Sequence, residues 1–377
     1  MAKKSLPLRS EGAARFRLRR HHLLDDTAAD PVTICRDVCG VQAQVASAAY
    51  LQLWVRNHAL TRGEIEHALW SARTLVKTSL MRQTLHLIPS DELPLYISAL
   101  RVCRVEDALR VMARFGITRE EGESLTPVIV EALADGPRGR SQIAAAIRPK
   151  ASKRVRAWMD RVWSHVRLAV AEGLICYGSG ENKETNFIRV DHWLPKLKMK
   201  LMPAAEAQSV LLQKYLRAYG PATLRDFAHW SGIPMRELKL LDPMCDGKII
   251  EMDEDKKRLI VREDAATVSA KSPARTKSKQ TIRLLPSFDV FLLGHREKDH
   301  LIPEKHYKRV YHNQWWISPV VLRDGEAAGV WSYKVRKNKL EVSVESFGGY
   351  PKIERKQIER EAESLGRYFE CELMLSF

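Results

Sequence analysis

The fold is indicated most clearly by the stretch Leu174-Ile-Cys-Tyr-Gly-Ser-Gly-Glu-Asn-Lys-Glu-Thr-Asn-Phe-Ile-Arg-Val190. Two apolar and β-branched runs flank a short polar segment that contains two glycines, a pattern that predicts a β-hairpin with a polar tip. Before this hairpin, tryptophan and valine recur every three or four residues, which predicts one long basic helix from about Val155 to Glu172 that ends at Gly173.

Two further helices are expected upstream of this long helix. Thr126-Pro127 has the pattern of an N-cap followed by proline at the first helical position. The sequence Asp135-Gly-Pro-Arg-Gly-Arg140 predicts a tight turn, and Ser141 is then placed to cap a short helix over residues 142–147. Three helices followed by a hairpin is the order of elements in a winged helix.

The same order recurs on both sides of this unit. In the first copy Pro31 begins a helix, Thr61-Arg-Gly-Glu64 forms a capping box, and residues 75–88 predict a hairpin. In the third copy the predicted hairpin pairs residues 248–252 with residues 258–261. We therefore expect three tandem winged helices, which span residues 1–115 (with an N-terminal helix), 116–200 and 201–263.

The remaining sequence divides into two parts. Residues 264–281 are small, polar and basic, and they predict a linker or mobile loop. Residues 282–377 contain several strand-like runs and a charged helix expected over residues 353–368. The predicted fold is thus mainly α with β (α+β), with three tandem winged-helix units and a C-terminal β-rich α+β module.

The charge of the chain indicates a polyanionic partner. Lys and Arg number 62 against 46 Asp and Glu, a formal net charge of +16. Such an excess favours nucleic acid, and we expect double-stranded DNA rather than a membrane. No apolar run reaches the roughly 18 residues of a membrane span. No secretory signal is evident, so a cytoplasmic, nucleoid-associated monomer is expected.

Neither a metal nor another cofactor is expected. The six cysteines are scattered without a C-x-x-C pair, which favours buried structural thiols over metal ligands. The spacing of His295, His300, His306 and His312 matches no zinc rule.

The candidate catalytic residues lie in Cys39-Gly-Val-Gln-Ala-Gln-Val45, where an apolar helical pattern breaks at Gly40. Gln42 and Gln44 are neither acids nor bases, so their carboxamides can only orient a partner by hydrogen bonding. One reaction needs little more than a positioned water: hydrolysis of a glycosidic bond whose base already carries a positive charge.

Cationic side chains are expected to surround this glutamine pair. In Met81-Arg-Gln-Thr-Leu-His-Leu87 the alternation predicts a strand with Arg82, Thr84 and His86 on one face. With Arg56 and Lys77, these residues would suit a phosphate and a flipped sugar. The alternative is that such side chains are surface residues or bind only within the protein.

A second basic region precedes the predicted long helix and continues into it. Residues 148–167 hold seven Lys or Arg and one acid, Asp160. This charge fits backbone phosphates bound through counterion release, although a solvated cationic surface gives the same pattern. The phosphate contacts expected here are Lys153, Arg154, Arg156 and Arg161.

Three motifs together resemble the AlkZ-like winged-helix DNA glycosylases. They are Gly40-Val-Gln-Ala-Gln44, the Met81–Leu87 stretch, and Leu284-Leu-Pro-Ser-Phe-Asp-Val-Phe-Leu-Leu-Gly-His-Arg296. The resemblance runs in the same order over nearly the whole chain. It departs from the family at Met81, where a more generic residue is usual, and in the unusually basic residues 264–281.

The resemblance implies a C-shaped basic cleft and a monofunctional DNA glycosylase that removes alkylated purines and unhooks interstrand crosslinks. It places the catalytic Gln-apolar-Gln pair on Gln42 and Gln44, whereas a sister branch has Asp at the second position. Arg296, at the end of the third motif, is an expected DNA contact.

Two other functions account for the same charge and modules. One is a non-catalytic winged-helix transcription regulator, in which the glutamine pair only caps a helix end. The other is a DNA-binding structural protein whose C-terminal module recruits a partner. Release of a free alkylated base would distinguish the glycosylase from both.

Overall fold

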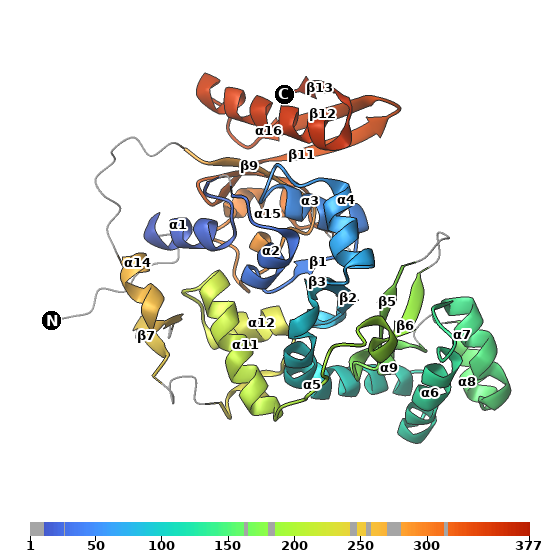
Figure 1. Ribbon diagram of the computed structural model, residues 1–377. Helices are drawn as coiled ribbons and strands as arrows, with labels where there is room; N and C mark the ends of the chain where they lie inside the picture. Colours follow the sequence, from blue (N-terminus) through green and yellow to red (C-terminus); the bar gives the residue numbers. More distant parts are fainter. Residues whose placement is uncertain are drawn as a thin grey trace.

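The computed structural model describes residues 11–25, 27–161, 165–179, 185–241, 247–253, 258–269, 280–312 and 316–377. These residues form a mixed α+β protein with one six-stranded, one five-stranded and one two-stranded sheet. Figure 1 shows the five-stranded sheet above the N-terminal helices, and the six-stranded sheet below them. Among the described residues, every helix is too short or too polar to span a membrane.

The N-terminal region begins its helices where the sequence predicts. Asp30 caps α2 by accepting hydrogen bonds from the backbone N–H groups of Val32 and Thr33, with Pro31 at the first helical position. Thr61 and Glu64 form the predicted capping box. The elements are α1 (Glu11–Arg20), α2 (Pro31–Asp37), β1 (Val41–Gln42), α3 (Ala46–Trp54), α4 (Arg62–Glu66), β2 (Leu75–Ser79), β3 (Leu85–Pro89) and α5 (Leu93–Ala113).

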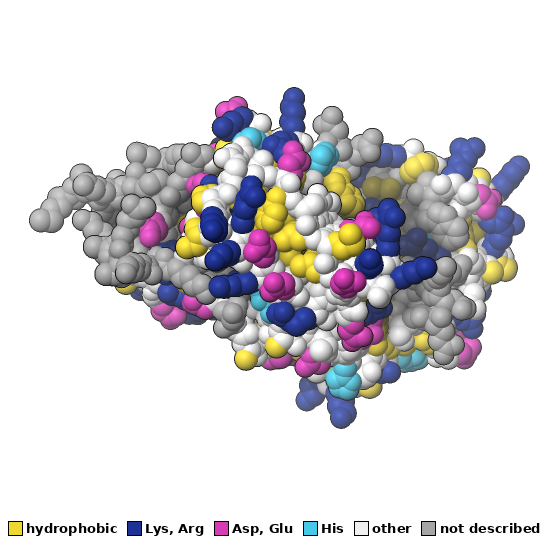
Figure 2. Space-filling view, turned by 90° about the horizontal axis from the view of Figure 1, so that it is seen from above, with side chains coloured by type: hydrophobic (Ala, Val, Ile, Leu, Met, Phe, Trp, Pro, Cys, Tyr) yellow, Lys and Arg dark blue, Asp and Glu magenta, His cyan; other side chains and the backbone are white. Residues whose placement is uncertain are grey.

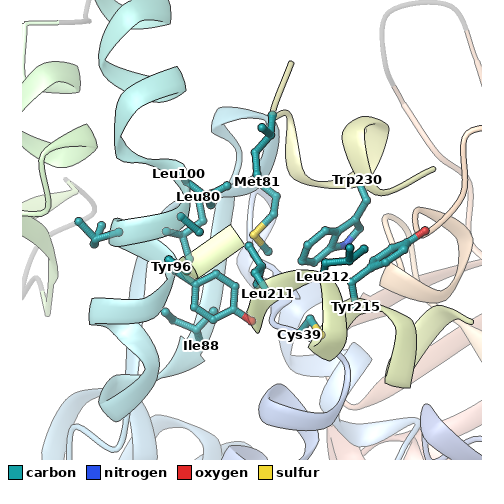
Figure 3. Packing of buried hydrophobic residues seen from close by; sticks show 14 of the residues in the cluster. Cys39, Leu80, Met81, Ile88, Tyr96, Leu100, Leu211, Leu212, Tyr215 and Trp230 are labelled. Carbon is teal, nitrogen blue, oxygen red and sulfur yellow. The ribbon is translucent and has the colours of Figure 1, made fainter. Parts of the chain in front are cut away.

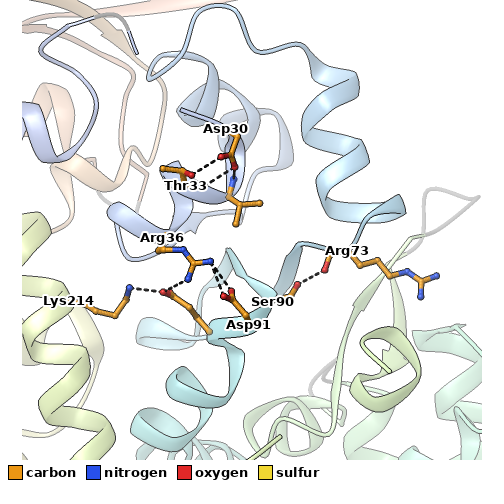
Figure 4. Close-up of polar contacts among 9 residues, drawn as sticks. Asp30, Thr33, Arg36, Arg73, Ser90, Asp91 and Lys214 are labelled. Carbon is orange, nitrogen blue, oxygen red and sulfur yellow. Dashed lines mark hydrogen bonds and ion pairs between the residues drawn. The ribbon is translucent and has the colours of Figure 1, made fainter. Parts of the chain in front are cut away.

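Ion pairs fix α2 against two later helices. Arg36 pairs with Asp91 and Glu92 at the start of α5, and Glu92 also accepts a hydrogen bond from Lys214 (Figure 4). Glu92 is mostly buried, so the contacts of these two cations with it are screened less than surface pairs. The segment that leads into β1 is thereby anchored at its start.

The second region corrects three predictions. Its short helix, α7, begins at Arg140 after the N-cap Gly139, so Ser141 lies inside this helix and does not cap it. Thr118 rather than Thr126 caps the first helix, because Thr118 and Glu121 form a complete capping box, and Pro127 lies inside that helix. The predicted long helix is divided: α8 ends at Met159 and α9 begins at Arg167, with turns at 160–161 and 165–166. The elements are α6 (Arg119–Ala132), β4 (Arg138–Gly139), α7 (Arg140–Ile147), α8 (Lys153–Met159), α9 (Arg167–Ala171), β5 (Ile175–Gly178), β6 (Asn186–Arg189) and α10 (Val190–Trp193).

The hairpins of the first two regions join into one sheet. The predicted hairpin is present as β5 and β6, and its tip at 180–184 lies outside the described residues. Lys77 of β2 pairs with Tyr177 of β5, which gives the strand order β1-β3-β2-β5-β6-β4. This strand pairing connects segments 100 residues apart and places the second region beside the glutamine pair.

The third region has the predicted three helices and hairpin. Thr223 and Asp226 form a capping box at the start of its second helix. A predicted linker begins at residue 264, but residues 265–269 form a helix whose Val268 is buried against α1, and residues 270–279 lie outside the described residues. The elements are α11 (Ala204–Tyr219), α12 (Leu224–Ser231), α13 (Met235–Leu238), β7 (Ile249–Asp253), β8 (Arg258–Val261) and α14 (Ala265–Ser269).

The C-terminal region is the predicted α+β layer. Its strand order is β13-β12-β11-β10-β9, with the β12–β13 pair parallel. Strand β9 begins at Ile282 and ends at Leu285, and a 3-10 turn later covers Val290–Leu292. The elements are β9 (Ile282–Leu285), α15 (Tyr307–Val310), β10 (Val320–Arg323), β11 (Glu326–Arg336), β12 (Lys339–Ser346), α16 (Lys352–Phe369) and β13 (Glu372–Ser376).

Shared cores hold the regions together. One cluster joins Cys39 and Ile88 of the first region to Tyr96 of α5 and to Leu211 and Trp230 of the third region (Figure 3). Another joins Leu51 and Trp54 of α3 to the C-terminal sheet. The assignment of the first three regions as winged helices, and their exact limits, stays a prediction.

Candidate active site

A sharp turn delivers Gln42 to the sheet. After α2, Cys39 (φ 59°) and Gly40 (φ 93°) both adopt left-handed backbone conformations. A β-carbon at Gly40 would lie 2.8 Å from Ile88 Cγ2, so only glycine fits here without displacing the core. The chain then pairs antiparallel with β3, and Gln42 lies opposite His86.

Gln42 is buried and Gln44 is exposed, although they are two residues apart. Gln42 is 6% exposed, and its Oε1 has no hydrogen-bond partner among the described residues. Gln44 Oε1 accepts a hydrogen bond from the backbone N–H of Leu85 (3.3 Å). That bond fixes the carboxamide while leaving its second lone pair and both N–H donors for a ligand.

Gln44 lines a cleft of about 180 Å³ between the first and second regions. The described residues that line the cleft include no Asp or Glu. They are Gln44, Ser79, Gln83, Leu85, Arg104, Arg140, Val166, Arg167, Val170, Ala171 and Tyr177. The cleft is therefore a concave, cationic site that suits a polyanion.

Three arginines give this cleft its charge. Arg104 is buried and donates hydrogen bonds to the backbone carbonyls of Val170 and Ala171. Burial lowers the pKa of Arg104 to about 10, so its guanidinium remains charged near pH 7. Arg167 donates a hydrogen bond to Gln83 Oε1 (2.7 Å). Arg140 is the third arginine that lines the cleft.

A strained turn stands beside Gln44. The predicted strand over Met81–Leu87 is wrong for its first part, because Met81–Gln83 forms a 3-10 turn and β3 begins only at Leu85. Arg82 (φ 51°) and Gln83 (φ 60°) both lie in the left-handed region, at a cost of about 1–3 kcal/mol each. Such strain persists only where the surroundings impose it, and it concentrates at functional sites.

Contacts from two other regions impose this turn. Arg82 donates a hydrogen bond to the backbone carbonyl of Trp230 in α12 (2.6 Å). Gln83 donates to Asp107 of α5 and accepts from Arg167 of α9. Thr84 closes the turn by donating to the carbonyl of Met81. The predicted common face of Arg82, Thr84 and His86 is therefore absent.

Two predicted DNA contacts are buried inside the protein. Arg56 forms a bidentate ion pair with Asp289, and both side chains are fully buried. His86 Nδ1 bonds to the Thr84 carbonyl, and burial lowers the pKa of His86 to about 3, so the ring is neutral at physiological pH. In this conformation neither side chain can reach a phosphate.

The other predicted cations remain accessible to different degrees. Lys77 is half-buried beside Tyr177, and burial lowers its pKa. Exposed cations on α8 and in the turn after it include Arg154, which pairs with Glu121. Arg296 is exposed, and its backbone N–H donates to Asp226. The exposed cations of the α8 segment are Lys153, Arg154, Arg156 and Arg161.

The structure brings together residues that sequence reasoning did not select. Arg104, Arg140 and Tyr177 come from α5, α7 and β5, and no local pattern joins them. Arg167 belongs to the basic run already noted. Seen from above, Lys and Arg side chains border a hollow on the right-hand side of the molecule (Figure 2).

A larger cavity lies elsewhere; Gln280 and Gln357 line it, but Gln42 and Gln44 do not. Its volume is about 590 Å³, and its lining includes Arg15, Arg283, Arg360 and Arg367 from α1, β9 and α16. Within the described part of the chain, no three His, Cys, Asp or Glu side chains are grouped to hold a metal ion. Asp25 and Glu361 also line that cavity, whereas the described lining of the cleft at Gln44 combines a predicted catalytic carboxamide with three arginines and no acid. Gln42 is not among the residues that line either space.

Comparisons with known proteins identify the family of the chain. A curated relative, the interstrand DNA cross-link repair glycosylase of Streptomyces sahachiroi, is 29% identical over 363 residues, which cover 93% of this chain and 94% of the relative. The solved structure of the Streptomyces sahachiroi DNA glycosylase AlkZ superposes with a TM-score of 0.83 at 26% identity, covering 97% of this chain and 98% of that one. The family model for AlkZ-like DNA glycosylases matches residues 35–368. The chain therefore belongs to the AlkZ-like family of DNA glycosylases.

Proposed function

We propose that this DNA glycosylase hydrolyses the N-glycosidic bond of cationic N7-alkylguanine and related lesions in duplex DNA, and that it unhooks interstrand crosslinks. The crosslink substrate is suggested by the name of the relative from Streptomyces sahachiroi. The observation that carries the reaction is Gln44, an exposed carboxamide fixed by Leu85 in a cationic cleft.

This reaction needs few catalytic groups from the protein. Alkylation at N7 makes the purine a cation, so the electron pair of the breaking C1′–N9 bond neutralises the departing base and no general acid is needed. A water oxygen forms the new bond to C1′, and its proton passes to solvent. The lining of the cleft fits this reaction, because it offers oriented amides and cations rather than an acid–base pair.

Gln42 and Gln44 would both bind that water through hydrogen bonds. Gln44 Oε1 keeps one lone pair free, and Gln42 Oε1 is a buried acceptor without a partner among the described residues. A buried acceptor of this kind is ordinarily satisfied by an ordered water or a ligand. Positioning a water behind the anomeric carbon can lower the barrier by several kcal/mol.

Duplex DNA would be gripped by tandem winged-helix units that form a C-shaped cleft. We assign phosphate contacts to Lys77, Arg140, Arg167 and Arg296 and to the exposed cations Lys153, Arg154, Arg156 and Arg161. Arg56 and His86 are left out because they are buried. Arg82 and Thr84 are left out because their side chains bond to backbone carbonyls within the protein. The enzyme would act as a monomer on the nucleoid. An open cleft suits a crosslinked base, which its tether keeps from swinging into a closed pocket.

The proposal is tested by base release. Methylated duplex and mustard-crosslinked duplex are incubated with the protein, and free N7-alkylguanine is measured by mass spectrometry alongside abasic sites. We expect release from both substrates, and separation of the crosslinked strands. Sequence-specific binding without any base release would instead identify a DNA-binding regulator.

A further inference from the structure

A buried chain of hydrogen bonds links Gln42 to the C-terminal region. Gln52, on α3 and fully buried, donates from Nε2 to the backbone carbonyl of Gln42 (2.9 Å). Its Oε1 accepts from the backbone N–H of Val290 (3.2 Å). One side chain thus joins the strand that carries the glutamine pair to a segment 248 residues later in the chain.

The Arg56–Asp289 pair fixes both ends of this link. Arg56 donates to both carboxylate oxygens of Asp289 at 2.8 Å, and also to the backbone carbonyl of Gln52 (2.7 Å). Asp289 in turn accepts from the backbone N–H of Phe291 (2.9 Å). The helix residue and the C-terminal turn are therefore held in one geometry by charge-assisted bonds.

Stability alone does not explain a fully buried ion pair. Removing two charges from water costs about as much as their attraction returns, and apolar replacements of similar volume are often neutral. What such a pair does fix is the relative position of the groups that it bonds. Here those groups are the carbonyl of Gln52 and the turn at Val290 and Phe291.

Strand β1 needs an outside support of this kind. It contains only Val41 and Gln42, so its own ladder with β3 is short. It is followed at once by Ala43, whose N–H bonds to the Leu85 carbonyl, and by Gln44. A displacement of about 1 Å at a reacting group can slow a reaction about a hundredfold.

We propose that Gln52, Arg56 and Asp289 are positioning residues, through which the C-terminal region holds β1 so that Gln42 and Gln44 can orient the water. The inference rests on the proposed function for its effect on rate. It gives the third sequence motif a role in the active site, because Asp289 and Val290 lie within that motif.

The test compares two buried glutamines. In Gln52→Met the side chain keeps its length and loses both hydrogen bonds. The matched control is Gln208→Met, because Gln208 is also buried in a helix (α11) and donates to a backbone carbonyl, that of Ala99. A third variant, Arg56→Met with Asp289→Leu, replaces the ion pair by apolar groups so that no buried charge is left unpaired.

Single-turnover base release, the Kd for lesion DNA and the thermal midpoint are measured for each variant. We expect Gln52→Met and the double variant to slow base release by roughly ten- to a hundredfold with Kd within twofold. Gln208→Met should keep the wild-type rate at a comparable loss of thermal stability. Equal effects of Gln52→Met and Gln208→Met on the rate would overturn the proposal.

Hydrogen exchange gives a readout that does not depend on activity. The amide of Ala43 should exchange slowly in the wild type and in Gln208→Met, and faster in Gln52→Met at equal global stability. Unchanged exchange at Ala43 in Gln52→Met would refute the positioning role even if the wild type released no base. Absence of base release from the wild type would refute the proposed function alone.

Discussion

Gln42 and Gln44 lie two residues apart in opposite surroundings. Gln42 is 6% exposed, and its carbonyl is bonded by Gln52 from the interior. Gln44 is exposed, and its side chain is bonded by Leu85 at the edge of the cationic cleft. The pair therefore has a buried side, held by packing and internal hydrogen bonds, and an open side that a ligand can reach.

The largest expected effect comes from removing both amides. Gln42→Ala and Gln44→Ala should each slow base release roughly a hundred- to a thousandfold, as loss of one oriented hydrogen-bonding group does at other sites. If both hold the same water, the double variant should be little slower than the worse single one. Single-turnover rates measure this, and multiplied losses would mean that the two amides act on different groups.

A smaller effect is expected from removing Arg167, a cation that lines the cleft beside Gln44. Arg167→Ala removes a charge from the cleft and the hydrogen bond to Gln83. Binding to duplex should weaken by about tenfold, and the slope of log K against log salt should fall by about 1. The control is Arg62→Ala, which removes an exposed arginine paired with Glu66 on α4. A salt slope unchanged from wild type in Arg167→Ala would remove Arg167 from the DNA contacts.

Acidification should lower the stability of the folded protein through its buried histidines. Burial lowers the pKa of His86 to about 3 and of His295 to about 3, against 6.5 in the unfolded chain. Below pH 6.5 these histidines therefore bind protons in the unfolded state but stay neutral in the folded state. For each such histidine, the free energy of unfolding falls by up to about 1.4 kcal/mol for every unit that the pH is lowered. Urea midpoints should fall between pH 7 and pH 5, and a constant midpoint would show that these histidines are not buried.

The open side should respond least to pH. Gln42 and Gln44 do not titrate, and Arg104, with a pKa of about 10, stays charged. The rate of base release per folded molecule should therefore vary by less than about threefold between pH 6 and pH 9, since no group proposed to touch the water changes charge there. A bell-shaped profile would reveal an acid or base that the cleft does not show.

Local signals in the sequence were reliable where a few neighbouring residues settle the structure. The capping pattern at Thr61, the proline at Pro31 and the hairpin after Gly173 all form as predicted. Thr126-Pro127 misled because the capping box at Thr118 starts the helix eight residues earlier. The capping box at Thr118 satisfies two backbone N–H donors, and the helix begins there.

The cleft itself could not be predicted, because distant segments build it. The alternation of Met81–Leu87 predicts a strand, yet bonds from Trp230, Asp107 and Arg167 hold the turn in its strained form. Arg56 has the sequence character of a surface cation, and only its pairing with Asp289, 233 residues later, makes it internal. The motif was enough to select Gln42 and Gln44 as candidates, whereas their surroundings depend on tertiary contacts.

The central claim is that an oriented amide, rather than an acid or base, drives the reaction. Its most direct test is the single-turnover release of N7-methylguanine from a duplex oligonucleotide by wild type and Gln44→Ala, with the Kd of both for the same duplex. The account predicts release at least a hundredfold slower in Gln44→Ala and a Kd within about twofold of wild type. Release at the wild-type rate would contradict it.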